Sequence, residues 1–290
     1  MSSAPIEKYR TWNGVVRSPW LACVPMVRVA LRLLYRRWMF WILMALGLMN
    51  FLFNFSLIYM KAVLSAQNEQ IAKFVDSYQV TGTGGAYLEF MAAQSSITAL
   101  LLAFAGSTLI GGDYQHGGLV FYLSRRIDRR HYIVGKLLAV MTVVTLITTL
   151  PACILFVQYG LMSSSLGYFR ENYRILLGIL GYGTVFAVVE SFVLFAVAVC
   201  VPRTVPLVMT WLGLAVLLKL VAEAFREING NRSWLLIAIQ DNIYRVGRWC
   251  FGVQTTRPPS PEACFAVLIG VCVACLAIIL WRVRAIEVVK

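Results

Sequence analysis

Few residues in this chain have the types and spacing that covalent chemistry needs. Its only histidines, His116 and His131, lie in one short polar connection, and no HExxH or GxSxG pattern occurs. The single Gly-Lys pair, Gly135-Lys136, has Arg130 at the position where a Walker A loop needs its first glycine. We therefore expect no catalytic set, no metal, no cofactor and no ATP-binding loop in this chain.

The one carboxylate deep inside an apolar segment is Glu190, near the midpoint of residues 175–201. An ionisable group at that depth is costly unless protein or water faces it. It either belongs to a transport pathway or is a paired or protonated group that joins two helices. Asn50 and Asn54, four residues apart and so on one helical face, have the same two interpretations, and hydrogen bonding to a neighbouring helix is the simpler one.

Residues 112–136 form a short connection that is rich in positive charge. Five basic residues occur there, between two long apolar segments: Arg125, Arg126, Arg129, Arg130 and Lys136. Such charge places a connection on the cytoplasmic side of a membrane. A short helix that is apolar at 119–123 and charged beyond it suits either docking into a cleft on a soluble partner or contact with anionic lipid.

The elements that must position these residues are membrane helices. The 290 residues are 60% apolar and 13% charged, whereas a soluble domain has about 25% charged residues. The net charge of +13 does not require nucleic acid, because basic residues collect on cytoplasmic loops and at lipid headgroups. We expect a multi-pass integral membrane protein that contacts membrane lipid and no nucleic acid.

Six apolar segments are long enough to cross about 30 Å of hydrocarbon. We predict an all-α, polytopic fold with one transmembrane domain, 38–290, after a cytoplasmic tail and interfacial helix, 1–37. Most of the 26 Lys and Arg residues then fall on one side, which predicts cytoplasmic N and C termini and no cleaved signal peptide. The predicted spans are 38–60, 88–111, 137–162, 175–201, 205–222 and 263–281.

Three further features can be predicted, one before the first span and two inside spans. Arg28, Arg32 and Arg36 share one helical face opposite an apolar stripe, which is typical of an amphipathic helix in the membrane interface. Pro151 should kink the third span, because it removes a helix hydrogen bond. Lys219 should lie near the outer end of the fifth span and extend its ammonium to the interface.

The loop at 223–262 contains two apolar stretches, 233–239 and 243–253, that are too short to span. They either dip into the outer leaflet or pack over the outer mouth of the bundle. We assign Cys250 and Cys264 to this one extracytoplasmic loop, and a disulfide between them is one alternative to two free thiols.

The central connection resembles the cytoplasmic loop of ABC-2 type permeases, the membrane subunits of a class of ABC exporters. That loop has an acidic residue after the second span and a Gly-Lys pair opening the third. Three positions depart from the pattern: Gly118 replaces threonine, Tyr122 replaces the first leucine and Arg126 replaces proline. The matching residues are Asp113, Gly117, Leu119, Leu123, Ser124, Arg129, Gly135 and Lys136.

The resemblance implies an exporting permease in the inner (plasma) membrane of a bacterium, which pairs with a second permease subunit. It implies that ATP is hydrolysed by a separate ATPase subunit, which docks on 113–132 as a coupling helix. The residues this assigns to coupling are Asp113, Gly117, Gly118, Leu119, Leu123, Arg129 and Lys136. Two other functions stay open: an ion-coupled secondary carrier centred on Glu190, and a membrane assembly factor that transports nothing. The sequence gives no transported substrate.

Overall fold

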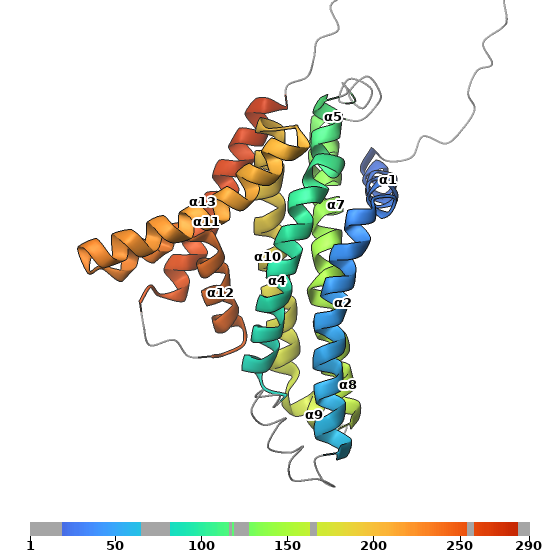
Figure 1. The fold of residues 1–290 in the computed structure, drawn as a ribbon, viewed down its shortest axis with the longest axis vertical. Coiled ribbons are helices and arrows are strands. Elements are labelled where there is room, and N and C mark those ends of the chain that lie inside the picture. The colour runs from blue at the N-terminus through green and yellow to red at the C-terminus, as the bar shows by residue number, and fades with distance from the viewer. Residues whose placement is uncertain are drawn as a thin grey trace, which may run out of the picture.

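The protein was analysed as a computed structural model, which describes residues 19–64, 82–115, 118, 128–162, 167–253 and 258–283. Within these ranges the chain is helical and contains no strand (Figure 1). The α-helices are α1 (Cys23–Tyr35), α2 (Trp38–Tyr59), α4 (Gly84–Gly106), α5 (Gly112–Gln115), α7 (Arg129–Ile147), α8 (Thr149–Met162), α9 (Gly167–Glu171), α10 (Tyr173–Cys200), α11 (Thr204–Asn229), α12 (Ile239–Cys250) and α13 (Pro261–Arg282).

Four shorter turns of other helix types join or extend these elements. Two are 3-10 turns, η1 (Pro19–Ala22) before α1 and η4 (Arg232–Ile237) before α12. Two are π-helical turns, η2 (Met60–Leu64) after α2 and η3 (Ser107–Gly111) between α4 and α5. A π turn within a helix is rare and often marks a functional site, so η3 is considered with the site below.

Six helical segments are long and apolar enough to cross a membrane, as the sequence predicts. They are Trp38–Val63, Gly84–Gln115, Arg129–Met162, Tyr173–Cys200, Thr204–Asn229 and Pro261–Arg282. The third begins eight residues earlier than predicted, because the basic turn that starts at Arg129 continues the helix beyond its apolar part. The fifth extends past residue 222 for the same reason, since its polar end is helical as well.

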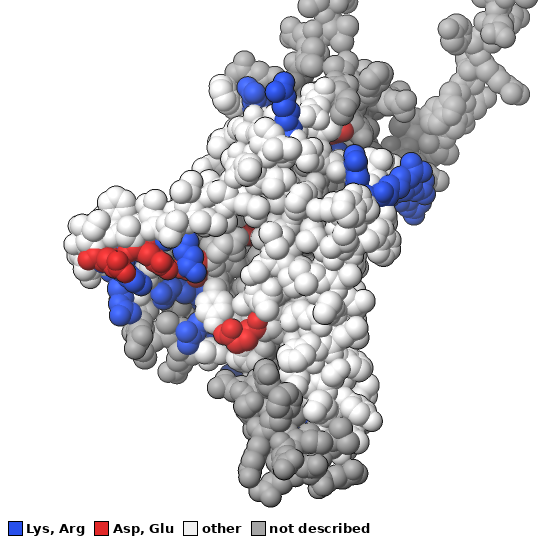
Figure 2. Space-filling view, in the orientation of Figure 1, with Lys and Arg blue, Asp and Glu red and all other residues white. Residues whose placement is uncertain are grey.

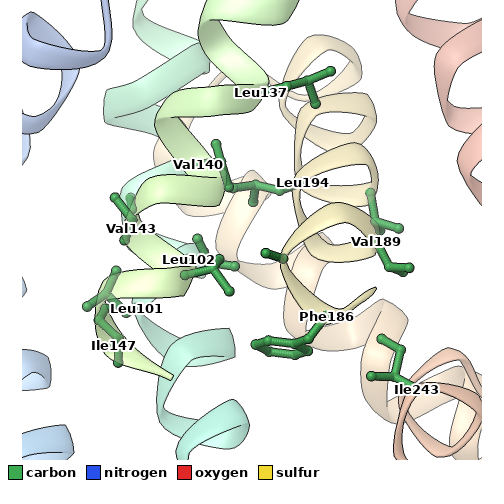
Figure 3. Packing of buried hydrophobic residues seen from close by; sticks show 14 of the residues in the cluster. Leu101, Leu102, Leu137, Val140, Val143, Ile147, Phe186, Val189, Leu194 and Ile243 are labelled. Carbon is green, nitrogen blue, oxygen red and sulfur yellow. The ribbon is translucent and has the colours of Figure 1, made fainter. Parts of the chain in front are cut away.

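The core lies around α10, which packs against α4, α7, α12 and α13. In the most apolar stretch of α10, 67% of residues are buried inside the chain, against 17% in α2 and in α11. Figure 3 shows side chains of α4, α7, α10 and α12 meeting, among them Leu102, Val140, Phe186 and Leu194. Because α2 and α11 bury so little, most of their apolar surface is left for lipid or another chain to cover.

The helices are arranged as an elongated bundle with one outlier (Figure 1). Helices α2, α4, α7 and α10 run along the long axis, whereas α11 slants away from the others. Helix α1 and the end of α13 lie at the same end of the bundle as α5. An even number of crossings requires the two flanks to share an end, but which side of a membrane this end faces stays a prediction.

The third span breaks close to the predicted position. Helix α7 ends at Ile147 and α8 begins at Thr149, with Pro151 in the first turn of α8. Proline has no amide hydrogen to give to the carbonyl four residues earlier, which belongs to Ile147. The break therefore lies one turn before the proline, where the missing bond would have formed.

The loop before the last span is neither extended nor detached. It forms η4 and then α12, and α12 packs against α10, α13 and α4. Asn242 is fully buried at this interface and donates from Nδ2 to the Leu236 carbonyl, 2.7 Å away. Cys250, the last residue of α12, and Cys264, in the first turn of α13, are both free thiols.

Candidate functional site

The first candidate site lies where the described ends of the central connection meet the bundle. Lys136, on α7, is 6% exposed, and its Nζ lies 2.7 Å from Asp113 Oδ2 on α5. The ammonium also donates to the Leu109 carbonyl in the π turn η3, at 2.6 Å. The Tyr132 hydroxyl donates to the same Asp113 oxygen, at 2.9 Å. This cluster joins the second and third spans by an ion pair between the buried Lys136 and the partly exposed Asp113, with added hydrogen bonds.

Two further contacts attach neighbouring helices to the start of α7. The Arg129 guanidinium donates to the Leu280 carbonyl near the end of α13. Gly135 allows α1 to approach closely, because an added Cβ there would lie only 2.7 Å from Met26 Sδ. The Gly-Lys pair thus has two packing roles: the glycine receives α1 and the lysine crosses to Asp113.

The residues that the resemblance assigned to coupling therefore fall into two groups. Asp113, Arg129 and Lys136 contact the chain's own atoms, and Gly118 lies against Asp113, whose Cα would be 3.4 Å from an added Cβ. The other three, Gly117, Leu119 and Leu123, lie outside the described residues. His131 is buried, with its ring 4.4 Å from that of Trp20, so it is part of the packing of η1 on α7.

A neutral polar network occupies the middle of the bundle. Asn50 Nδ2 on α2 donates to Gln94 Oε1 on α4 at 2.7 Å, which confirms the predicted bond to a neighbouring helix. Asn54 donates instead within its own helix, to the Asn50 carbonyl. Gln94 Nε2 donates to the Ile147 carbonyl at 2.9 Å, so it satisfies the group that Pro151 leaves without a donor. The network thus ties three spans together at the break.

Glu190 is the second candidate site. It is 2% exposed on α10, and its Oε1 accepts a hydrogen bond of 2.6 Å from Gln240 Nε2 in the first turn of α12. Oε2 receives no hydrogen bond from the part of the chain that the structure describes. A pocket adjoins this carboxylate, and Lys219 and Asp241 are among its lining residues. Lys219 therefore lines the same pocket as Glu190, ten residues before the end of α11, and its depth in a membrane stays a prediction.

Sequence reasoning missed the partners rather than the charged residues themselves. Tyr132 and Gln240 complete the two candidate sites and Gln94 completes the neutral network, and each comes from a different element than the group it serves. Only Gln94 had a usable signal, because Pro151 implies a carbonyl in need of a donor.

Within the described ranges, no group of three His, Cys, Asp or Glu side chains is placed to hold a metal ion. The surface of the bundle is mostly uncharged in Figure 2, where Lys and Arg gather near α1 and at that end of the bundle. Charges of both signs gather at the far end of α11. No protein-family model matches the chain, and no curated protein matches it.

Proposed function

We propose that this chain is the permease subunit of an ATP-driven transporter of the ABC-2 type, in which a separate subunit hydrolyses ATP. The observation that carries the proposal is how the 113–132 connection is anchored. Its first residue, Asp113, is held by Lys136 and Tyr132 of the third span. Near its other end, Arg129 is bonded to the sixth span at Leu280. A partner that pushes on this connection would move three spans together.

Asp113, Gly118, Arg129 and Lys136 act in this proposal by fixing the connection, and Gly117, Leu119 and Leu123 belong to the part that a partner would contact. Two permease subunits would form the pathway, and the little-buried faces of α2 and α11 are available for the second copy. Asn50, Asn54 and Glu190 are the polar groups closest to such a pathway. Export through a bacterial inner membrane, with both termini cytoplasmic, follows from the resemblance alone.

Helix α1 is proposed to lie in the cytoplasmic interface of the membrane. Its inward face buries Cys23, Met26, Ala30 and Leu34, while its arginines are exposed to the outside. An exposed row of arginines beside apolar side chains suits the boundary between headgroups and acyl chains. Anionic lipid would then hold α1 against α7, at the same end as the connection.

The docking part of the proposal is tested by Leu119→Asp combined with Leu123→Asp. We expect the double variant to reach the membrane and to lose co-purification with the ATPase subunit, because two carboxylates cannot enter an apolar cleft without cost. A matched control is Phe225→Asp with Ile228→Asp, at the far end of α11, where both side chains are exposed. Equal recovery of the ATPase with both double variants would refute docking at 113–132.

One observation favours a second function, a carrier driven by an ion gradient: Glu190 is buried with a single described hydrogen bond. Transport that survives ATP depletion and is abolished by Glu190→Gln would establish the carrier and refute the permease. Transport that stops on ATP depletion would favour the permease and refute the carrier. A chain with neither an ATPase partner nor any flux would be an assembly factor.

A further inference from the structure

The pocket beside Glu190 differs from the other polar sites because it combines a buried charge with accessible space. It is bounded by α4, α10, α11 and the start of α12, and most of its lining is apolar. The polar lining residues are Glu190, Lys219, Gln240 and Asp241. Because Glu190 Oε2 receives no hydrogen bond from the described residues, the carboxylate keeps an acceptor that a bound group can use.

From this we infer that the pocket binds the ammonium group of a small primary amine with an apolar body. A primary ammonium has three N–H donors, and three lining side chains carry oxygen acceptors: Glu190, Gln240 and Asp241. An ammonium that is hydrogen-bonded to the carboxylate compensates the cost of removing the carboxylate from water. A neutral or an anionic guest does not compensate that cost. The inference concerns binding only, and it holds whether or not the chain is a permease subunit.

The walls of the pocket select for the apolar body. Trp211 lines it, and its position is fixed because its Nε1 donates to the Ala99 carbonyl at 2.9 Å. A cation near an indole ring is attracted to its face. Leu214 and Leu218 continue the apolar lining along α11. An alkyl chain attached to the ammonium would replace lipid or water along these side chains.

Pocket size limits the head group. The cavity has a volume of about 50 Å³, and one water-sized probe needs roughly 10–15 Å³ in the same measure. That space holds an ammonium with its first carbon atoms. A trimethylammonium group has no N–H donor for the Glu190 carboxylate, so we expect the site to reject it.

Lys219 offers a test of whether the pocket prefers a cationic or an anionic guest. It lines the same pocket but forms no ion pair with Glu190 in the described structure. Its ammonium repels a cationic guest and would attract an anionic or zwitterionic one. Replacing it with methionine, which keeps the apolar stem, should therefore strengthen binding of an amine.

The experiment measures binding of radiolabelled n-hexylammonium to the tagged, purified protein in dodecylmaltoside. The competitors are 1-hexanol, hexanoate and hexyltrimethylammonium, which share the chain and differ in the head group. We expect only unlabelled n-hexylammonium to compete. Competition by 1-hexanol at the same concentration would overturn the inference. This comparison uses the wild-type protein alone.

Three variants refine the result. Glu190→Gln should weaken binding by at least about thirtyfold, as expected for loss of one partner of a buried charge pair. Lys219→Met should strengthen it, and Glu223→Gln, on α11 but outside the pocket lining, should leave it unchanged. Unchanged binding by Glu190→Gln, or loss of binding by Lys219→Met, would overturn the inference. Each variant is first checked for a single size-exclusion peak.

Discussion

Two buried charged residues of this bundle, Lys136 and Glu190, differ in how fully the chain itself compensates their charge. At the end that carries the connection, Asp113 faces Lys136, and Tyr132 and the Leu109 carbonyl take up further hydrogen-bonding capacity. On α10, Glu190 has one neutral amide as its described partner and an adjoining pocket. The first charge is compensated by the protein itself, whereas the second is compensated only in part.

This difference separates a structural charge from one that is available to a ligand. A buried ion pair contributes little net stability but becomes costly when one partner is removed. Glu190 forms no ion pair in the described structure, so a substitution that removes its charge breaks no ion pair. Substitutions should therefore have large effects on stability at the first site and small effects at the second, where the effect should be on binding.

The largest effect is expected for Lys136→Met. It leaves Asp113, whose side chain is 20% exposed, without its cation, and we expect a loss of about 3 kcal/mol in the free energy of unfolding, the lower end of the range for a fully buried pair. Unfolding by sodium dodecyl sulfate in mixed micelles, followed by circular dichroism, measures the change. The control is Lys219→Met, whose exposed lysine has no described ion pair, and a change within about 0.5 kcal/mol is expected there. Equal losses for the two variants would remove the distinction between the sites.

An intermediate effect is expected for Gln94→Leu. It leaves the Ile147 carbonyl without a donor next to Pro151 and leaves the Asn50 amide without its acceptor, at a cost of about 1–3 kcal/mol. The same unfolding assay applies, with Thr142→Val as control because that exposed hydroxyl bonds only within its own helix. If Gln94→Leu were as stable as the wild type, the neutral network would not support the break in the third span.

A smaller effect on stability is expected for Glu190→Gln. A glutamine side-chain oxygen still accepts from Gln240, and the substitution removes a charge, so stability should stay within about 1 kcal/mol of the wild type or rise. The same variant is expected to lose amine binding. A loss of stability as large as that of Lys136→Met would show that Glu190 is part of the structural framework.

The smallest effect is expected at Tyr244, on α12 outside the six candidate spans. Burial, and then its hydrogen bond to Glu89, raise the pKa of Tyr244 from its ordinary value of 10 to about 12. Because the pKa of Tyr244 is higher in the folded protein than in the unfolded chain, its neutral hydroxyl stabilises the fold. This contribution to the free energy of unfolding is complete below pH 10 and is lost as the pH rises through 12. Tyr244→Phe should cost about 0.6 kcal/mol, equally at pH 6 and pH 9. A clear difference between these two pH values would contradict the assignment.

The sequence was sufficient for the six spans, because long apolar runs bounded by charge are a local signal. The same holds for the break near Pro151, since the missing amide acts four residues away. Helix ends were less predictable: Arg129 and the polar end of α11 continue helices whose apolar parts stop earlier. The helix α12 was visible only as a short apolar stretch, because its partners α10 and α13 lie elsewhere in the chain.

The candidate sites were predicted as single residues and not as pairs. Asn50 and Glu190 stand out because polar groups in apolar segments are costly, whereas Asp113 and Lys136 were singled out by the resemblance alone. Which group each one meets depends on how the helices are rotated about their axes, and no spacing within one segment determines that rotation. Gln240 is the clearest case, since it is 50 residues from Glu190 and lies in a loop in the predicted topology.

The most direct test of the proposed function is a pull-down of the tagged chain from its native membrane in mild detergent, with ATPase activity measured on the eluate. The account predicts a soluble partner in stoichiometric amount that hydrolyses ATP and is lost with the Leu119→Asp, Leu123→Asp double variant. A pure eluate without ATPase activity, repeated in several detergents, would contradict the account and leave the carrier centred on Glu190 as the better explanation.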